Sequence, residues 1–281
     1  MLSYRHAFHA GNHADVLKHF ILWLVLDYYN RKDKPYWYID THSGAGLYNL
    51  HSNEAQKVGE YQYGIARLQQ AATLPEPLMQ FRQHLQHIVP QAHLYCGSPW
   101  LAQATLRAAD KLRLFELHPS DFQHLQSNMR EARLNRRGIL KQEDGFHGLI
   151  ALLPPATRRA VVLIDPPYES KHDYELVGKT LKEAQKRFEQ GCYLVWYPCL
   201  SRVESKKLPE QLKKLSPHNH IQAELYVHEP RADGFGMHGS GMFIINPPYL
   251  LAEQLQTCLP ALSQLLQQDK GARFVLNYQL K

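Results

Sequence analysis

The chain has 281 residues, of which 44% are hydrophobic and 21% charged, so wholesale disorder is excluded and one large α/β domain or two small ones are possible. Its longest strongly apolar run, residues 20–26, is far shorter than the roughly 20 residues that a membrane-spanning helix needs. A formal net charge of +6 favours a polyanionic partner but does not select RNA or DNA. Because the Met1 end shows no signal-peptide core and the four cysteines form no C-x-x-C pair, we expect a cytoplasmic protein with reduced thiols.

The first predicted element is a helix over residues 12–30, with apolar side chains along one face. Ahead of it, residues 4–13, here called the N-terminal block, combine aromatic and basic side chains that have no evident reason to be buried. Such a mixture suits an unpaired base and its phosphates. Three histidines of the block have ligand-like spacing, but apart from Asp15 no carboxylate or cysteine nearby completes a tetrahedral set, which disfavours a metal site. These histidines are His6, His9 and His13.

The second predicted element is a strand over residues 35–40, which runs into a loop of small residues, 41–46. Glycines in such a loop let the backbone approach a ligand closely. The loop lacks the third glycine of G-x-G-x-x-G, so it is a weak dinucleotide signature and fits a ligand without a pyrophosphate better. A nicotinamide oxidoreductase is disfavoured for the same reason.

From about residue 48 to residue 93 the strand–helix alternation is interrupted. Two amphipathic stretches, near 58–70 and 78–88, predict helices, and the segment is rich in Gln and His. We interpret residues 48–93 as a helical insertion. After it, Ser98 is predicted to cap a new helix whose first residue is Pro99.

Two of the following strands are predicted to end beside acidic residues. The strand over 111–116 ends in Glu116, whose carboxylate can accept both ribose hydroxyls of an adenosine group. The short strand 139–142 is followed by Asp144 and Gly145, which can bind an adenine amino group and let the ring lie flat against the backbone. Both strand ends therefore suit an adenosine-containing ligand.

The most specific motif is Asp165-Pro166-Pro167-Tyr168, which follows the buried run 161–164. The prolines cannot donate ladder hydrogen bonds, so they predict a rigid turn at the carboxyl end of a central strand, where open α/β sheets bind ligands. Asp165 and the Pro166 carbonyl can accept the hydrogens of an exocyclic amino group, and Tyr168 offers a flat face for a base, worth about 1–3 kcal/mol. The tetrapeptide resembles the signature of amino-group methyltransferases that use S-adenosylmethionine, and the loop 41–46 fits the methionine portion of that cofactor. The alternative is a turn that only ends a strand and starts a helix.

The remaining predicted elements are a helix over 174–189, strands over 192–197, 222–228 and 242–246, and a helix over 250–267. Asn246-Pro247-Pro248-Tyr249 is a second tetrapeptide of the same type, after the predicted seventh strand. In a methyltransferase fold that strand is antiparallel and its carboxyl end faces away from the cofactor, so we interpret Asn246 as structural. Residues 231–241, with four glycines, predict a loop that can close over substrate.

Taken together, residues 4–19, 40–46, 97–99, 116–119 and 165–168 resemble the bacterial adenine-N6 methyltransferases of large-subunit (23S) ribosomal RNA, nearly end to end. The visible departure is Ser43, where alanine is expected. The resemblance implies an α/β, class I methyltransferase fold with a Rossmann-like seven-stranded sheet, in a single domain over 1–281 with the helical insertion after the first strand. It also implies a monomer that prefers naked 23S RNA and has no membrane partner.

The same resemblance implies a role for individual residues. The enzyme would use S-adenosylmethionine to methylate N6 of a specific flipped-out adenine by in-line transfer, with Asp165 as the catalytic acid and Tyr4 touching the RNA. The positions that match cofactor contacts are Lys18, His19, His42, Ser98, Glu116, Asp144, Gly145 and Asp165. The substrate-binding candidates are Tyr4, Arg5, His6, Pro166 and Tyr168, and no metal is expected.

Three other functions remain open at this point. A DNA adenine-N6 methyltransferase shares the tetrapeptide, although no separate target-recognition domain is visible. A glutamine-N5 protein methyltransferase normally has Asn-Pro-Pro-Tyr at the fourth strand. A non-catalytic DNA-binding protein, involved in the use of external DNA, is opposed by the intact set of Glu116, Asp144 and Asp165.

Overall fold

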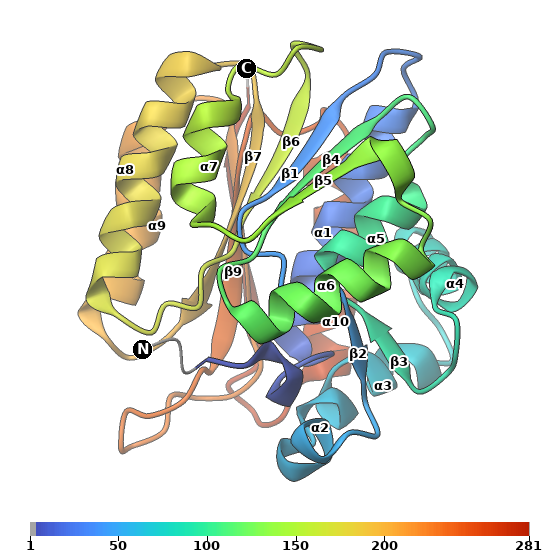
Figure 1. The fold of residues 1–281 in the computed structure, drawn as a ribbon. Coiled ribbons are helices and arrows are strands. Elements are labelled where there is room, and N and C mark those ends of the chain that lie inside the picture. The colour runs from blue at the N-terminus through green and yellow to red at the C-terminus, as the bar shows by residue number, and fades with distance from the viewer. Residues whose placement is uncertain (1–3, 281) are drawn as a thin grey trace.

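One mixed sheet runs through the computed structural model, which describes residues 4–280 apart from the side chain of Asn135 (Figure 1). The prediction about a signal peptide concerns the Met1 end, which begins outside the described residues. The strands of this sheet are, in chain order, β1 Trp37–Asp40, β4 Lys111–Phe115, β5 Gly138–Lys141, β6 Ala160–Ile164, β7 Cys192–Cys199, β8 His220–Tyr226, β9 Gly239–Ile245 and β10 Arg273–Gln279. Their spatial order is β10-β8-β9-β7-β6-β1-β4-β5.

The chain changes direction across the sheet between β1 and β6. It first builds outward from β1 to β4 and β5, and then returns to place β6 on the other side of β1 and β7 beyond it; all these pairs are parallel. β9 is antiparallel to both of its neighbours. In open α/β sheets ligands bind outside the carboxyl ends of the strands at such a switch point. The topology therefore brings Asp40, at the end of β1, and Asp165, just after β6, to the same edge of the sheet.

The seven predicted strands are confirmed, but the expectation of a seven-stranded sheet is wrong. Within the described residues the sheet has eight strands, because β10 adds an antiparallel edge strand beside β8. Most residues of β10 are exposed or half-buried. An edge strand of this kind has no buried apolar run, so the sequence pattern does not distinguish it from a loop.

Helices cover both faces of the sheet, as Figure 1 shows. Because successive strand residues point to opposite faces, Tyr38 and Leu112 join one hydrophobic core while Ile39 and Phe115 join the other. The helices of the first face are α1 His13–Asn30, α5 Ser98–Thr105, α6 Pro119–Glu131 and α10 Leu251–Leu266. The helices of the second face are α7 Gly145–Leu152, α8 Lys171–Arg187 and α9 Val203–Leu215, of which α7 and α9 were not predicted.

α1 begins where the sequence predicts it, because the side chain of Asn12 accepts hydrogen bonds from the N–H groups of Ala14 and Asp15, each at 3.0 Å. The burial of this helix extends beyond the one apolar face that the sequence shows. Every residue from His13 to Leu26 is buried. α1 packs against β9, α5 and α10 at once, so it is a central helix and not a surface helix.

The predicted insertion is helical and lies beside the start of α1, at one end of the sheet (Figure 1). Its ends are joined by a small antiparallel pair of strands, which the sequence did not predict, and Gly59 and Gly64 interrupt the first predicted helix. The elements are β2 Leu47–Asn49, α2 Asn53–Val58, the 3₁₀ helix η2 Glu60–Tyr63, α3 Ile65–Gln70, α4 Glu76–Ile88 and β3 Leu94–Cys96. Two more 3₁₀ turns, η1 His6–Phe8 and η3 Asn135–Arg137, precede α1 and β5.

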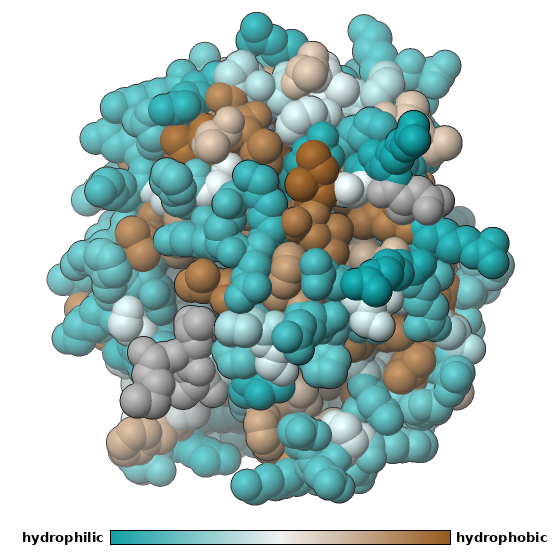
Figure 2. Space-filling view, in the orientation of Figure 1, coloured by the Kyte–Doolittle hydropathy of each residue, from teal (hydrophilic) through white to brown (hydrophobic). Residues whose placement is uncertain are grey.

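Among the described residues, no helix is both long and apolar enough to cross a lipid bilayer. The face of the molecule shown in Figure 2 is largely hydrophilic, with hydrophobic side chains in separate small groups. Nothing on this face forms a continuous apolar band.

Candidate active site

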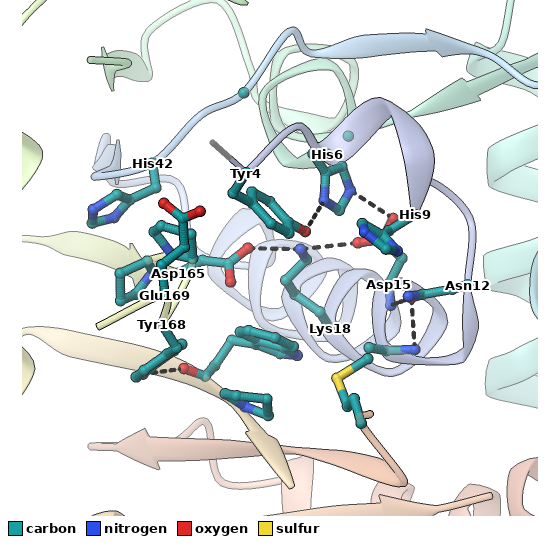
Figure 3. A pocket seen from close by; sticks show the side chains of 18 of the residues that line it. Tyr4, His6, His9, Asn12, Asp15, Lys18, His42, Asp165, Tyr168 and Glu169 are labelled. Atoms are coloured by element: carbon teal, nitrogen blue, oxygen red, sulfur yellow. Dashed lines mark hydrogen bonds and ion pairs between the residues drawn. The ribbon is translucent and has the colours of Figure 1, made fainter. Parts of the chain in front are cut away.

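A cavity of about 840 Å³ opens at the carboxyl ends of β1, β4 and β6, and the N-terminal block forms one of its walls (Figure 3). All thirteen residues predicted as cofactor or substrate contacts lie in this region, and all but Arg5 line the cavity. The predicted residues that line it are Tyr4, His6, Lys18, His19, His42, Ser98, Glu116, Asp144, Gly145, Asp165, Pro166 and Tyr168. The insertion and the loop after β8 also contribute, through Glu60, Tyr63, His228 and Arg231.

Asp165 is held by Lys18. The Lys18 Nζ atom donates to Asp165 Oδ2 at 2.6 Å and also pairs with Asp15 Oδ1 at 2.9 Å (Figure 3). The side chains of Lys18 and Asp15 are 7% and 1% exposed, so this is a buried set of two carboxylates around one ammonium. Lys18 therefore pairs with both carboxylates and fixes the direction of Asp165.

Burial and charge act in opposite directions on these three groups. Burial acts to lower the pKa of Lys18, but Asp15 and Asp165 outweigh it and the pKa is raised. Burial acts to raise the pKa of Asp15, yet His6 and Lys18 hold it well below its usual value. At Asp165 burial prevails over Lys18, so its pKa is raised. Lys18 thus opposes the effect of burial on the pKa of Asp165 and favours its ionised form.

The N-terminal block extends this set of contacts to Tyr4. The Tyr4 hydroxyl lies 2.9 Å from His6 Nδ1, and His6 Nε2 lies 2.9 Å from Asp15 Oδ2 (Figure 3). The expectation that residues 4–13 have no reason to be buried is wrong for residues 10–13, which are buried under the insertion and the cavity wall. Arg5 does not line the cavity but pairs at 3.4 Å with Asp121, which does.

His19 and His42 are both neutral imidazoles at the cavity. His19 Nδ1 lies 2.6 Å from the hydroxyl of Tyr95, and burial lowers the pKa of His19 to about 3. The ring of His42 stands edge-on to Phe146 with centroids 4.8 Å apart, and burial lowers its pKa to about 4. Neither histidine belongs to the Lys18 cluster, so each offers hydrogen bonding without charge.

Ser98 does not cap its helix, contrary to the prediction. The N-cap of α5 is Gly97, and Ser98 is the first helical residue. The Ser98 hydroxyl instead donates to Asp40 Oδ2 at 2.6 Å, and the Tyr38 hydroxyl donates to the same oxygen at 2.7 Å. The hydroxyl of Ser98 is therefore bonded to the buried carboxyl of Asp40 and does not cap α5.

The buried carboxyl of Asp40 should make the stability of the protein depend on pH. Burial raises its pKa to about 6, although Ser98 and Tyr38 oppose this. The folded protein thus binds this proton more tightly than the unfolded chain, and the free energy of unfolding should fall as the pH rises from about 4 to about 6, by about 3 kcal/mol for this group. Urea unfolding at a series of pH values tests this; Asp40→Asn, which cannot titrate, should show a flatter dependence in that range, and an unchanged slope would contradict it.

Glu116 and Asp144 face the cavity from neighbouring strand ends. Glu116 accepts backbone N–H groups from Gly44 at 2.8 Å and from His118 at 2.7 Å, which fixes both of its oxygens. Burial raises the pKa of Glu116. Asp144 is the N-cap of α7, with its side chain accepting from the N–H of Phe146 at 2.8 Å. The next residue, Gly145, packs so closely on Thr41 that a Cβ atom would collide with the Thr41 carbonyl.

The tetrapeptide follows β6 directly, and Tyr168 makes contacts that the sequence did not suggest. Tyr168 has a φ of 52°, which is rare for a residue with a large side chain. Its hydroxyl donates to the Trp196 carbonyl at 2.6 Å, and its ring packs 4.6 Å from that of Tyr174. Although Tyr168 lines the cavity, it is 3% exposed, so little of its ring is open.

The second tetrapeptide does not reach the cavity, which confirms Asn246 as structural. Asn246 Nδ2 donates to the carbonyls of Glu189 and Gly191, and its Oδ1 accepts from Asn219. These bonds tie the end of β9 to the turns before β7 and β8.

The sequence analysis did not identify several residues that belong to the site. They are Asp15, Asp40, Glu60 and Trp196, over whose ring the Lys18 ammonium lies at 5.6 Å. Asp40 carries a usable signal, because it is an acid at the end of a buried strand, like Glu116. Glu60 and Trp196 carry none, since only the fold brings them to the cavity.

A parallel sheet with this switch point, acidic strand ends around one cavity and an Asp-Pro-Pro-Tyr turn after the fourth strand define a class I methyltransferase. The residues fit S-adenosylmethionine: the cavity has room for a nucleoside next to Glu116 and Asp144, and residues of the small-residue loop 41–46 line it as well. Residues 33–277 match the family model described as "Ribosomal RNA large subunit methyltransferase D, RlmJ", and the chain belongs to this family. It is therefore an enzyme that uses S-adenosylmethionine as its methyl donor.

Relatives and a solved structure agree with this assignment. The chain is 44% identical over 269 residues to ribosomal RNA large subunit methyltransferase J of Haemophilus influenzae, covering 95% of this chain and 94% of that protein. It is 45% identical over 268 residues to the Escherichia coli protein of the same name, with the same coverage. A crystal structure of a Legionella pneumophila protein superposes with a TM-score of 0.88 at 32% identity, covering 97% of this chain and 100% of that one.

Proposed function

We propose that this enzyme methylates N6 of one specific adenine in 23S ribosomal RNA, with Asp165 as the catalytic residue. That the substrate is ribosomal RNA follows from the family to which the chain belongs. The choice of an adenine amino group rests on the Asp165 turn beside the cavity. The carboxylate of this turn accepts a hydrogen bond from Lys18 Nζ at 2.6 Å. We also propose that the protein acts as a cytoplasmic monomer on naked RNA, as a single domain over 1–281 with residues 48–93 inserted.

S-adenosylmethionine supplies an electrophilic methyl group when it is bound. Among the chain's residues, we assign the cofactor contacts to Glu116, Asp144, Gly145, His42 and Ser98, with Lys18 and His19 at the edge of this set. Glu116 suits the ribose because its oxygens are already fixed by two N–H groups and retain acceptor capacity toward the cavity. Asp144, anchored at the start of α7, suits the adenine amino group.

Asp165 and the Pro166 carbonyl accept the two N6 hydrogens of the flipped-out target base. This draws the nitrogen lone pair out of conjugation with the ring and directs it along the line of transfer. The base loses its stacking partners in the RNA, and Tyr4 and His6, at the cavity wall, are suited to replace them, with the small open part of the Tyr168 ring beside them. The new N–C bond would form as the bond between the methyl group and the cofactor's sulfur breaks. The amino group becomes acidic at that stage, so its proton would pass to the Asp165 carboxylate or to water only afterwards.

The test uses labelled S-adenosylmethionine with three acceptors: unmodified deproteinised 23S RNA, single-stranded DNA and duplex DNA. We expect label only in the RNA, recovered as N6-methyladenosine after digestion to nucleosides. Label in DNA would favour the DNA adenine methyltransferase, and label in none of the three would revive the non-catalytic binder. Repeating the assay with assembled large subunits checks the preference for naked RNA.

A further inference from the structure

The insertion holds the N-terminal block from outside the cavity. Glu60 Oε2 accepts a hydrogen bond from Asn12 Nδ2 at 2.9 Å and pairs with His9 Nδ1 at 3.1 Å. The N–H of Ile65 donates to the Gly11 carbonyl at 2.8 Å. Gly64 lies so close to the same backbone that a Cβ atom on it would collide with the Gly11 carbonyl oxygen. Close backbone packing therefore holds the N-terminal block against the insertion, and the Glu60 carboxylate bonds to the side chains that lie between them.

His9 transmits this support toward the cavity. Its ring is stacked on that of Tyr4, with centroids 5.7 Å apart and planes 8° apart. Tyr4 is the first member of the set of contacts that runs through His6, Asp15 and Lys18 to Asp165 (Figure 3). This series of contacts thus has Glu60 of the insertion at one end and Asp165 at the other.

We propose that Glu60 is a positioning residue for methyl transfer, which holds His9 and Asn12 and thereby keeps the ring of Tyr4 at the wall of the cavity that receives the target adenine. The insertion then serves the reaction by supporting the N-terminal block, without touching the reacting atoms. This inference rests on the proposed function.

The charges of the pair agree with this role. The hydrogen bond to Glu60 raises the pKa of His9 in spite of burial, and Asp15 acts in the same direction. At Glu60 burial acts to raise the pKa, but His9 and Asn12 outweigh it and the pKa is lowered. The groups that face His9 are thus Glu60 and Asp15, with Tyr4 against its ring. The pair is strongest below the raised pKa of His9 and weakens as the pH rises through it.

The first test is Glu60→Gln, which keeps the shape and an acceptor oxygen but removes the charge. We expect kcat/KM for 23S RNA to fall about tenfold, the scale of one hydrogen bond to a charged group. The dissociation constant of S-adenosylmethionine should stay at the wild-type value. The fall of kcat/KM that the wild type should show as the pH rises through the pKa of His9 should be absent in this variant, because without the Glu60 charge the protonation of His9 no longer strengthens the pair. The matched control is Glu54→Gln, an exposed glutamate of the same insertion on α2, which should match the wild type in all three measurements.

The second test measures the block without activity. Trypsin cleavage after Arg5, followed by mass spectrometry, should be faster in Glu60→Gln than in the wild type or in Glu54→Gln. The double variant Glu60→Gln/His9→Gln should be no slower in transfer than Glu60→Gln alone, because both changes break one pair. A wild-type rate, pH profile and cleavage rate in Glu60→Gln would overturn the inference, as would additive losses in the double variant. If the wild type itself transfers no methyl group to 23S RNA, the proposed function fails, and the cleavage comparison still decides whether Glu60 holds the block.

Discussion

Replacement of Asp165 by alanine should reduce methyl transfer to 23S RNA by about a thousandfold or more, the scale expected when a group that aligns and polarises the nucleophile is lost. The side chain lies directly after β6 and accepts a hydrogen bond from Lys18 Nζ at 2.6 Å, so alanine removes the acceptor that this contact holds in place. Lys18 keeps its contact with Asp15 in this variant, and the fold should survive. Single-turnover transfer with labelled cofactor measures the effect, and calorimetric titration of S-adenosylmethionine should give a dissociation constant close to that of the wild type.

Asn246→Ala is the matched control, since it alters the corresponding residue of the second tetrapeptide. Asn246 bonds only to the turns around Asn219, Glu189 and Gly191 among its described contacts, so its loss should lower stability and leave turnover per folded enzyme unchanged. Wild-type turnover in Asp165→Ala, or a comparable loss in Asn246→Ala, would show that the catalytic carboxylate has been assigned to the wrong residue.

The second large effect is expected for Lys18→Met, which should destabilise the protein by about 3–5 kcal/mol, the usual result of removing one partner from a buried ion pair. The change leaves Asp15 and Asp165, 1% and 13% exposed, without their shared cation. It should also abolish methyl transfer, because Asp165 loses both its charge partner and its fixed direction. Urea unfolding monitored by circular dichroism gives the change in the free energy of unfolding.

A second substitution separates the two contributions. Lys18→Met/Asp15→Asn removes one of the unpaired carboxylates, so it should recover part of the stability but none of the transfer. Lys182→Met, on the exposed side of α8, is the control and should behave as the wild type. A Lys18→Met protein as stable as the wild type would mean that the two carboxylates are not held by Lys18 in solution.

The sequence predicts the features that depend on residues close together in the chain, and it misses those that depend on residues far apart. The buried runs before Asp40, Glu116 and Asp165 are local patterns, and they place the strands and the acids at their ends correctly. The edge strand β10 has no such pattern, because half-exposed residues satisfy its pairing with β8. Ser98 looks like a helix cap for the same local reason, and only Asp40, which is 58 positions away, reveals its actual bond.

The role of Glu60 and the contact of Lys18 with Asp165 could not be predicted for a physical reason. Glu60 meets His9 and Asn12 across 51 and 48 positions of sequence, and Lys18 meets Asp165 across 147. Contacts of this length depend on how the insertion and α1 pack on the finished sheet. The resemblance to a known family supplied residue positions near the cavity, but not the contacts that hold them.

The central position of α1 has a consequence for the order in which the protein matures. The helix leaves the ribosome before any strand of the sheet, yet its partners β9 and α10 lie within residues 239–266. Until those residues have been synthesised, the apolar surface of α1 and its Lys18 side chain have no complete burial site. Nascent chains should therefore expose an aggregation-prone apolar surface for most of translation. Synthesis at about 5–20 residues per second makes this an interval of many seconds, during which a chaperone that covers apolar helices would improve the yield of active enzyme. Truncations anywhere before α10 should accordingly be insoluble, even though every acidic strand end is already present in them.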